Sequence, residues 1–80
     1  MKPYEHFGRL MAHHRGTTPA RLIAERTGVG VRTIAEIEGG TILPTCKSFA
    51  ALVHVYRTRE LAPMSDAAVV ELVSAMTVRS

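Results

Sequence analysis

Glycine and proline residues divide this 80-residue chain into five short segments, and the apolar residues within each segment recur with helical spacing. Phe7, Leu10, Met11 and His14, for example, fall at i, i+3, i+4 and i+7, which is one side of an α-helix. The chain has no sustained alternation of apolar and polar residues, so a sheet is not expected. The sequence therefore predicts a single all-α domain of five helices.

Capping residues and glycines set the expected helix ends. Thr18, a favourable N-cap, precedes Pro19, the residue type preferred at the first helical position. Gly28 is expected to end that helix with a positive φ, and Thr45 is expected to cap the fourth helix. The predicted helices cover about residues 3–15, 19–27, 31–39, 46–56 and 65–78, with a polar linker at 57–64.

The same spacing predicts which side of each helix is buried. Ile34, Ile37 and the stem of Glu38 mark the inner side of the third helix. Arg32 and Glu36 are therefore expected to point outward. The expected inner residues of the fourth helix are Cys46, Phe49, Leu52, Val53 and Tyr56. On this interpretation the cysteine is a small buried hydrophobe.

Composition argues against several classes of protein. A single cysteine allows no internal disulfide, and the four histidines do not have the spacing of metal ligands. No catalytic set is recognisable, so we expect no enzyme, metal, cofactor or small-molecule ligand. No apolar run is long enough for a membrane span, and the charged first 15 residues do not resemble a signal peptide. The net charge of +3 permits an anionic partner.

The second and third predicted helices, with a glycine-containing turn between them, have the outline of a helix-turn-helix at about residues 18–39. In such a motif the first helix crosses the phosphate backbone, and the second lies in the major groove, where the base edges differ. The polar outer side of the third helix fits this arrangement. The sequence therefore predicts a protein that binds double-stranded DNA.

Three stretches carry a resemblance to a known family: IAERTGVG at 23–30, IAEIEGG at 34–40, and Pro44. At this spacing they are similar to the phage repressor/Cro-type (XRE-like) helix-turn-helix family over residues 7–56. The resemblance implies a lambda-repressor-like domain over 1–80 that acts as a homodimer on a palindromic operator. It also implies an ion pair between Glu38 and the first helix, for which His14, next to Arg15, is the expected partner.

Four residues of the third helix are candidates for base contacts. Arg32 is expected to read guanine through a bidentate contact to O6 and N7; its alternative is a surface ion pair with Glu36. Glu36 is expected to orient Arg32 or to accept from cytosine N4. Thr33 and Val31 either touch thymine methyl groups or phosphate, or pack at the helix edge.

Five further residues are candidates for phosphate contacts. Arg21 and Arg26 belong to the second helix, and Thr41, Thr45 and Lys47 lie around the start of the fourth. The N-terminus of the fourth helix adds backbone N–H groups and the positive end of a helix dipole. The alternative for each arginine is an ordinary solvated charge.

The fifth helix has more apolar residues than a thin core needs. Leu61, Met64, Val70 and Met76 are therefore predicted to form a dimer contact, with simple capping of the domain as the alternative. Leu22 falls outside the inner side of the second helix, so it is expected under the fifth helix or at an interface.

The leading hypothesis is a transcriptional regulator, most simply a repressor, in the cytoplasm of a bacterium or of a phage-infected host. A second hypothesis is an antitoxin that binds a toxin protein as well as DNA. A third is a protein-interaction module whose helix-turn-helix no longer meets DNA. Glu36 and the modest net charge of +3 favour keeping the third hypothesis open.

Overall fold

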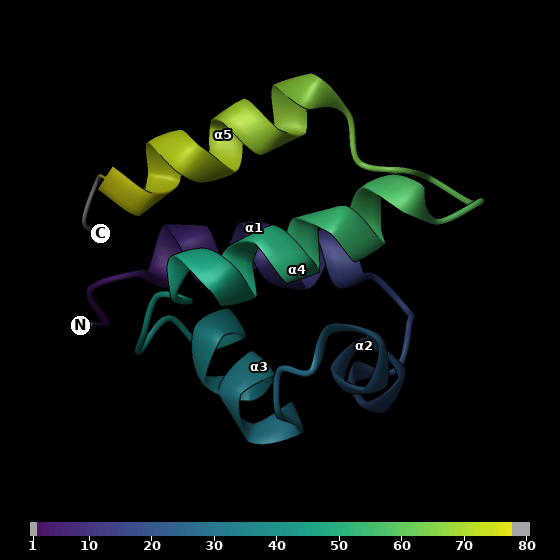
Figure 1. Ribbon diagram of the computed structural model, residues 1–80. Coiled ribbons are helices and arrows are strands. Elements are labelled where there is room, and N and C mark those ends of the chain that lie inside the picture. Colours follow the sequence, from purple (N-terminus) through teal and green to yellow (C-terminus); the bar gives the residue numbers. More distant parts are fainter. Residues whose placement is uncertain (1, 78–80) are drawn as a thin grey trace.

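The computed structural model describes residues 2–77, and this part of the chain forms five α-helices and no strand (Figure 1). This confirms the predicted all-α architecture in one domain. None of these helices is both long and apolar enough to cross a membrane. The helices are α1 (Glu5–Arg15), α2 (Ala20–Thr27), α3 (Val31–Glu38), α4 (Cys46–Thr58) and α5 (Asp66–Thr77).

Most of the predicted helix ends are confirmed by the hydrogen bonds found there. The Thr45 hydroxyl accepts from the Ser48 N–H at 3.1 Å and caps α4. Ser65 Oγ accepts from the Ala68 N–H at 3.1 Å in the same way before α5. Gly28 ends α2 with φ 78°, the left-handed conformation that favours glycine.

The prediction that Thr18 caps α2 is wrong. The first α2 hydrogen bonds run from the Leu22 and Ile23 N–H groups to the Pro19 carbonyl, so Pro19 itself is the N-cap and no side chain caps the helix. Thr18 instead belongs to the connection from α1, where its carbonyl accepts from Arg15 Nη1 at 2.9 Å. The helix therefore begins one residue later than the capping preference of Thr18 predicts.

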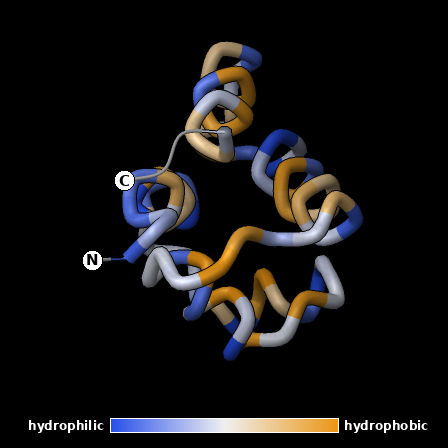
Figure 2. Tube along the Cα trace, turned by 90° about the vertical axis from the view of Figure 1, so that its left-hand side faces the viewer, coloured by the Kyte–Doolittle hydropathy of each residue, from blue (hydrophilic) through white to orange (hydrophobic). Residues whose placement is uncertain are grey.

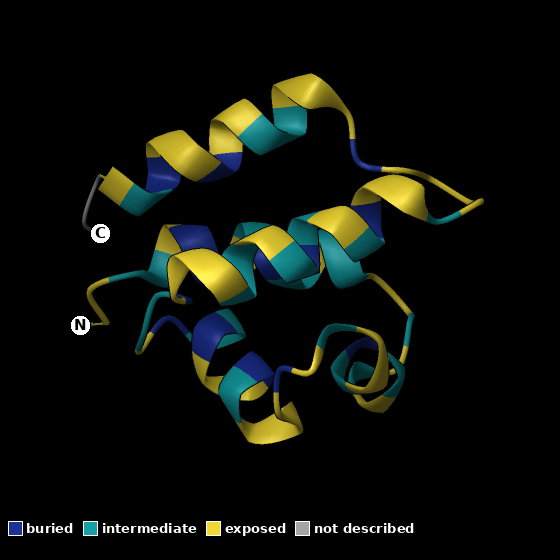
Figure 3. Ribbon diagram, viewed as in Figure 1, coloured by how far each residue is buried: buried dark blue, intermediate teal, exposed yellow. Residues whose placement is uncertain are grey.

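The helices lie in three levels. α1 and α4 form the middle, α5 lies on one side of them, and α2 and α3 lie on the other (Figures 1 and 2). α3 packs against α1 and α2, α2 also packs against α4, and α5 packs against α1. Because α5 and α3 occupy opposite sides of the middle level, their exposed sides face away from each other (Figure 3).

The core draws residues from every helix and from two connections. Its buried members are Phe7, Met11, Ile23, Val29, Ile34, Ile37, Leu52, Tyr56, Met64, Leu72 and Ala75. Cys46 is exposed, so its predicted burial is wrong. Helical spacing places Cys46 in line with Phe49 and Leu52, but burial also requires a covering element, and residues 45–47 are all exposed.

The connection between α4 and α5 is shorter and more ordered than the linker predicted at 57–64. α4 continues to Thr58, and Arg59 Nε then donates to the Ala62 carbonyl at 3.0 Å. The Met64 N–H donates to the Tyr56 carbonyl at 3.0 Å, which brings the Met64 side chain into the core. Arg57 Nη2 lies 2.5 Å from Asp66 Oδ1 and joins the ends of the two helices.

Burial raises the pKa of the Tyr56 phenol from its ordinary value of 10.0 to about 12, and the nearby Glu38 carboxylate adds to the rise. The folded protein therefore favours the neutral phenol. We expect this contribution to stability to be complete below pH 10.0 and to disappear as the pH rises through about 12, a loss of roughly 2–3 kcal/mol. Urea unfolding at a series of alkaline pH values measures it.

Tyr56→Phe is the matched control, since it keeps the buried ring and removes the ionisable hydroxyl. Its free energy of unfolding should fall less steeply across this alkaline range than that of the unchanged protein. If the free energy of unfolding fell equally steeply with pH in both proteins, the loss of stability at alkaline pH would come from groups other than Tyr56.

Candidate nucleic-acid interface

A three-residue turn fixes α3 on α2. The Thr27 hydroxyl donates to the Ile23 carbonyl at 2.8 Å and accepts from the Val29 N–H at 3.1 Å. Val29 itself is buried, and Gly28 supplies the positive φ that reverses the chain. The two hydrogen bonds order the end of α2 and the turn, and α2 and α3 pack against each other beside the buried Val29.

The two sides of α3 differ as the sequence predicts. Ile34 and Ile37 are buried, whereas Arg32 and Glu36 are exposed. Val31 is 46 % exposed and Thr33 is half-buried, so both lie at the edge of the outer side. Arg32 and Glu36 do not form an ion pair with each other among residues 2–77, so the alternative prediction of a surface ion pair between them is not supported.

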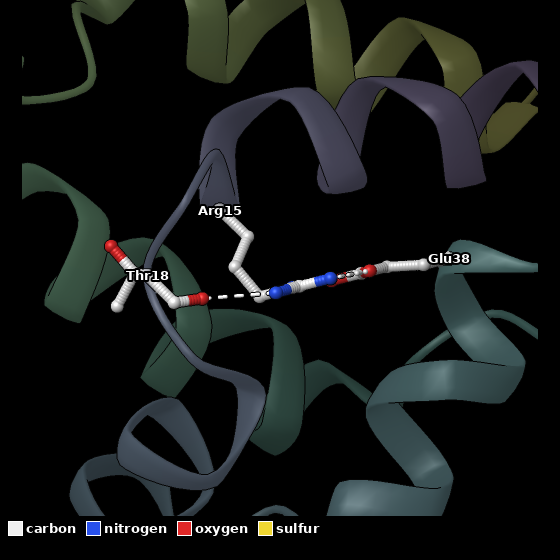
Figure 4. A network of polar contacts seen from close by, with 3 residues as sticks. All are labelled: Arg15, Thr18 and Glu38. Carbon is white, nitrogen blue, oxygen red and sulfur yellow. Dashed lines mark hydrogen bonds and ion pairs between the residues drawn. The ribbon is translucent and has the colours of Figure 1, made fainter.

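A bidentate ion pair anchors the C-terminal end of α3 to α1 (Figure 4). Arg15 Nε and Nη2 donate to the two Glu38 carboxylate oxygens at 2.7 and 2.9 Å. The prediction of His14 as the partner is therefore wrong by one residue. Arg15 reaches Glu38 from the last position of α1, while His14 lies among the packed side chains. Hydrogen bonding to Glu38 raises the pKa of Arg15, so this pair is not the pH-sensitive contact that a histidine would make.

The candidate phosphate contacts fall into two groups. Thr41, Thr45 and Lys47 are exposed on the segment that leads from α3 into α4. Thr41 Oγ1 donates to the Glu36 carbonyl at 3.0 Å and Thr45 caps α4, so both hydroxyls already have backbone partners. Lys47 makes no ion pair within residues 2–77.

The two arginines of α2 lie in different surroundings. Arg21 is exposed. Arg26 is also exposed, but it borders a cavity formed with the ends of α1 and α4 and with the α4–α5 connection. No α3 residue lines that cavity, so the structure separates Arg26 from the outer side of α3.

Two of the four residues predicted for a dimer contact are well exposed. Leu61 is 85 % and Val70 is 64 % exposed. Met64 is buried, which makes its prediction as an interface residue wrong, because the α4–α5 connection folds its side chain inward. Met76 is half-buried and packs against the core.

Val73, which is not among the residues predicted for the dimer contact, is an apolar residue of α5 that is 47 % exposed. It lies three residues after Val70, so the two share one side of the helix. Leu22 is half-buried and lines the same cavity as Ala68 of α5.

Residues 2–77 contain no group of three or more histidine, cysteine, aspartate or glutamate side chains placed to hold a metal ion. Comparison of the chain with profiles of known protein families, with curated proteins and with solved structures finds no match.

Proposed function

We propose that this protein binds double-stranded DNA in a sequence-specific manner through α2 and α3, used as a helix-turn-helix of the lambda-repressor-like type. The observation that carries the proposal is the division of α3 into two sides. Ile34 and Ile37 anchor the helix in the core, while Arg32 and Glu36 project outward without an ion pair between them. A rigid helix with an unpaired guanidinium on its outer side suits the major groove.

In this proposal Arg32 donates to guanine O6 and N7, and Glu36 accepts from cytosine N4. Val31 and Thr33, at the edge of the outer side, lie beside thymine methyl groups or phosphate. Lys47 and the exposed backbone N–H groups at the start of α4 meet the phosphate backbone, and Thr41, Thr45 and Arg21 flank them. The Arg15–Glu38 pair acts indirectly, because it holds the end of α3 in place.

The proposed regulator acts as a homodimer that represses by occupying a promoter. Val70 and Val73 of α5, with Leu61, supply its apolar contact. Because α5 and α3 lie on opposite sides of the middle level, pairing through α5 leaves α3 uncovered (Figure 1). Two half-sites would then be about 10 bp apart, or a multiple of that spacing.

Selection of bound duplexes from a random pool tests the proposal directly. We expect an enriched palindromic motif, and an affinity that falls steeply as salt increases. A pool that shows no enrichment, or binding that is independent of salt, would contradict DNA binding by this chain.

Arg32→Ala and Lys47→Ala are expected to change binding to the selected site in different ways. Loss of Arg32 should cost roughly 1–3 kcal/mol and relax the preference at one base position, because a base contact is removed. Loss of Lys47 should weaken all sequences alike and reduce the salt slope by about one, because a phosphate contact is removed. Fluorescence anisotropy on matched and mismatched duplexes distinguishes the two. If Arg32→Ala left the base preference unchanged, Arg32 would not be a base-contacting residue.

A further inference from the structure

A cavity of about 900 Å³ opens between the helix-turn-helix unit and the base of α5. The ends of α1 and α4 form two of its walls, α2 forms a third, and the α4–α5 connection with the start of α5 forms the fourth. This volume lies in the range of small-molecule sites, which is unusual room for a domain of this size. The sequence alone predicts no ligand of this kind.

The cavity has an apolar part and a polar part. Leu22 of α2 and Val55 of α4 face it, as do Leu61, Met64 and Ala68 from the connection and α5. Leu61 is the most exposed large apolar residue described in the chain, at 85 %. An apolar body placed in the cavity would therefore remove an exposed leucine from water as well as burying its own surface.

Arginine and histidine side chains are prominent in the polar part of the cavity. Arg26, Arg59 and His14 line it, and Glu60 is the single acidic residue among the lining residues. Arg15 also lines it, but its guanidinium is committed to Glu38 and to the Thr18 carbonyl. With Arg15 paired, Arg26 and Arg59 leave the lining one positive charge in excess of Glu60.

One of these groups is held in position, and two have no partner within the described residues. The Arg59 guanidinium lies over the Tyr56 ring, 5.3 Å from its centroid, and Nε donates to the Ala62 carbonyl. His14 Nε2 is buried and has no hydrogen-bond partner within the described chain. Arg26 has no ion pair there either. A buried polar atom without a partner is uncommon and costs free energy until one arrives.

We propose that this cavity binds a small organic acid, with its apolar body against Leu22, Val55 and Ala68 and its carboxylate between Arg26, Arg59 and His14. A carboxylate carries a negative charge and accepts several hydrogen bonds, so it can pair with the two guanidinium groups and with His14 Nε2 at the same time. His14 would donate from Nε2, the tautomer that a carboxylate selects. The ligand would touch both α2 and the α4–α5 connection and so restrict their relative movement.

This inference does not rest on DNA binding, and it is tested without DNA. 4-Phenylbutyrate is titrated into the full-length protein and followed by ¹H–¹³C NMR of the His14 ring and of the Met64 and Ala68 methyl groups. 4-Phenylbutan-1-ol keeps the apolar body without the charge, and acetate keeps the charge without the body. We expect the acid to shift these signals in a saturable manner and at lower concentration than either control compound.

Arg26→Gln should weaken binding of 4-phenylbutyrate by about fivefold to tenfold, as expected when a charge-assisted hydrogen bond is lost. Arg21→Gln is the matched control, since it removes an equal charge from the same helix at a position outside the cavity, and it should leave the affinity unchanged. Circular dichroism confirms that both variants remain folded.

Three results would overturn the proposal: equal shifts with the acid and the alcohol, shifts confined to residues outside the cavity, or equal weakening by the two substitutions.

Discussion

Gly8→Ala is expected to destabilise the protein by roughly 2–3 kcal/mol, although alanine is the better helix former by about 1 kcal/mol. α1 crosses the end of α3 at this glycine. A Cβ atom placed on Gly8 would lie 2.6 Å from the Glu38 carbonyl oxygen and 2.7 Å from that of Ile37. Both obstacles are backbone atoms, so they can yield only if the helices move apart. Thermal unfolding should show a fall in Tm of about 10–20 °C.

Gly30→Ala provides the control for this prediction. The same substitution at Gly30 meets nothing closer than Thr33 Oγ1 at 3.9 Å, and the backbone has φ −64°, which alanine adopts without strain. We expect a change of less than about 0.5 kcal/mol. If Gly8→Ala were as mild as Gly30→Ala, the close approach of α1 to α3 would not exist in solution.

Arg15→Met is expected to cost roughly 2–4 kcal/mol. The substitution keeps an apolar stem but leaves the Glu38 carboxylate, whose side chain is only 13 % exposed, without its two donors. Removing one partner of a buried pair is strongly destabilising because the other charge stays poorly solvated. The expected loss of stability is smaller than for a fully buried ion pair, because the Arg15 side chain is 26 % exposed. Urea unfolding measures the change.

The double variant Arg15→Met with Glu38→Leu distinguishes this explanation from simple loss of packing. With both charges replaced by apolar groups, most of the lost stability should return, to within about 1 kcal/mol of the unchanged protein. A double variant as unstable as the sum of the two single variants would show that the charges are not coupled.

Helix existence and helix sides could be predicted from the sequence because both depend on local spacing. Ile34 and Ile37 are buried and Arg32 and Glu36 are exposed, as predicted, since a residue's angle around a helix depends only on its position in the chain. The helix ends that are marked by glycine were predictable because they also depend on local conformation. Gly28 adopts its positive φ whatever packs around it, because few other residues tolerate that conformation.

The errors have a different origin, since they concern contacts outside the regular spacing of a single helix. Thr18 lies in the α1–α2 connection, where its carbonyl accepts from Arg15, and Pro19 takes the N-cap position. Arg15, and not His14, reaches Glu38 across 23 positions of the chain. Met64 is buried because the connection bends back to Tyr56. Spacing within a helix carries no information about any of these contacts.

The sequence by itself determined five amphipathic helices, their approximate ends and the outward direction of Arg32, because these follow from backbone geometry and the period of one helix. Only the tertiary structure decided which cation neutralises Glu38, that Cys46 is exposed, and that a cavity with uncompensated positive charge separates α2 from the start of α5. Those features depend on the distances between helices, and such distances are set by how the side chains of several segments fill shared space.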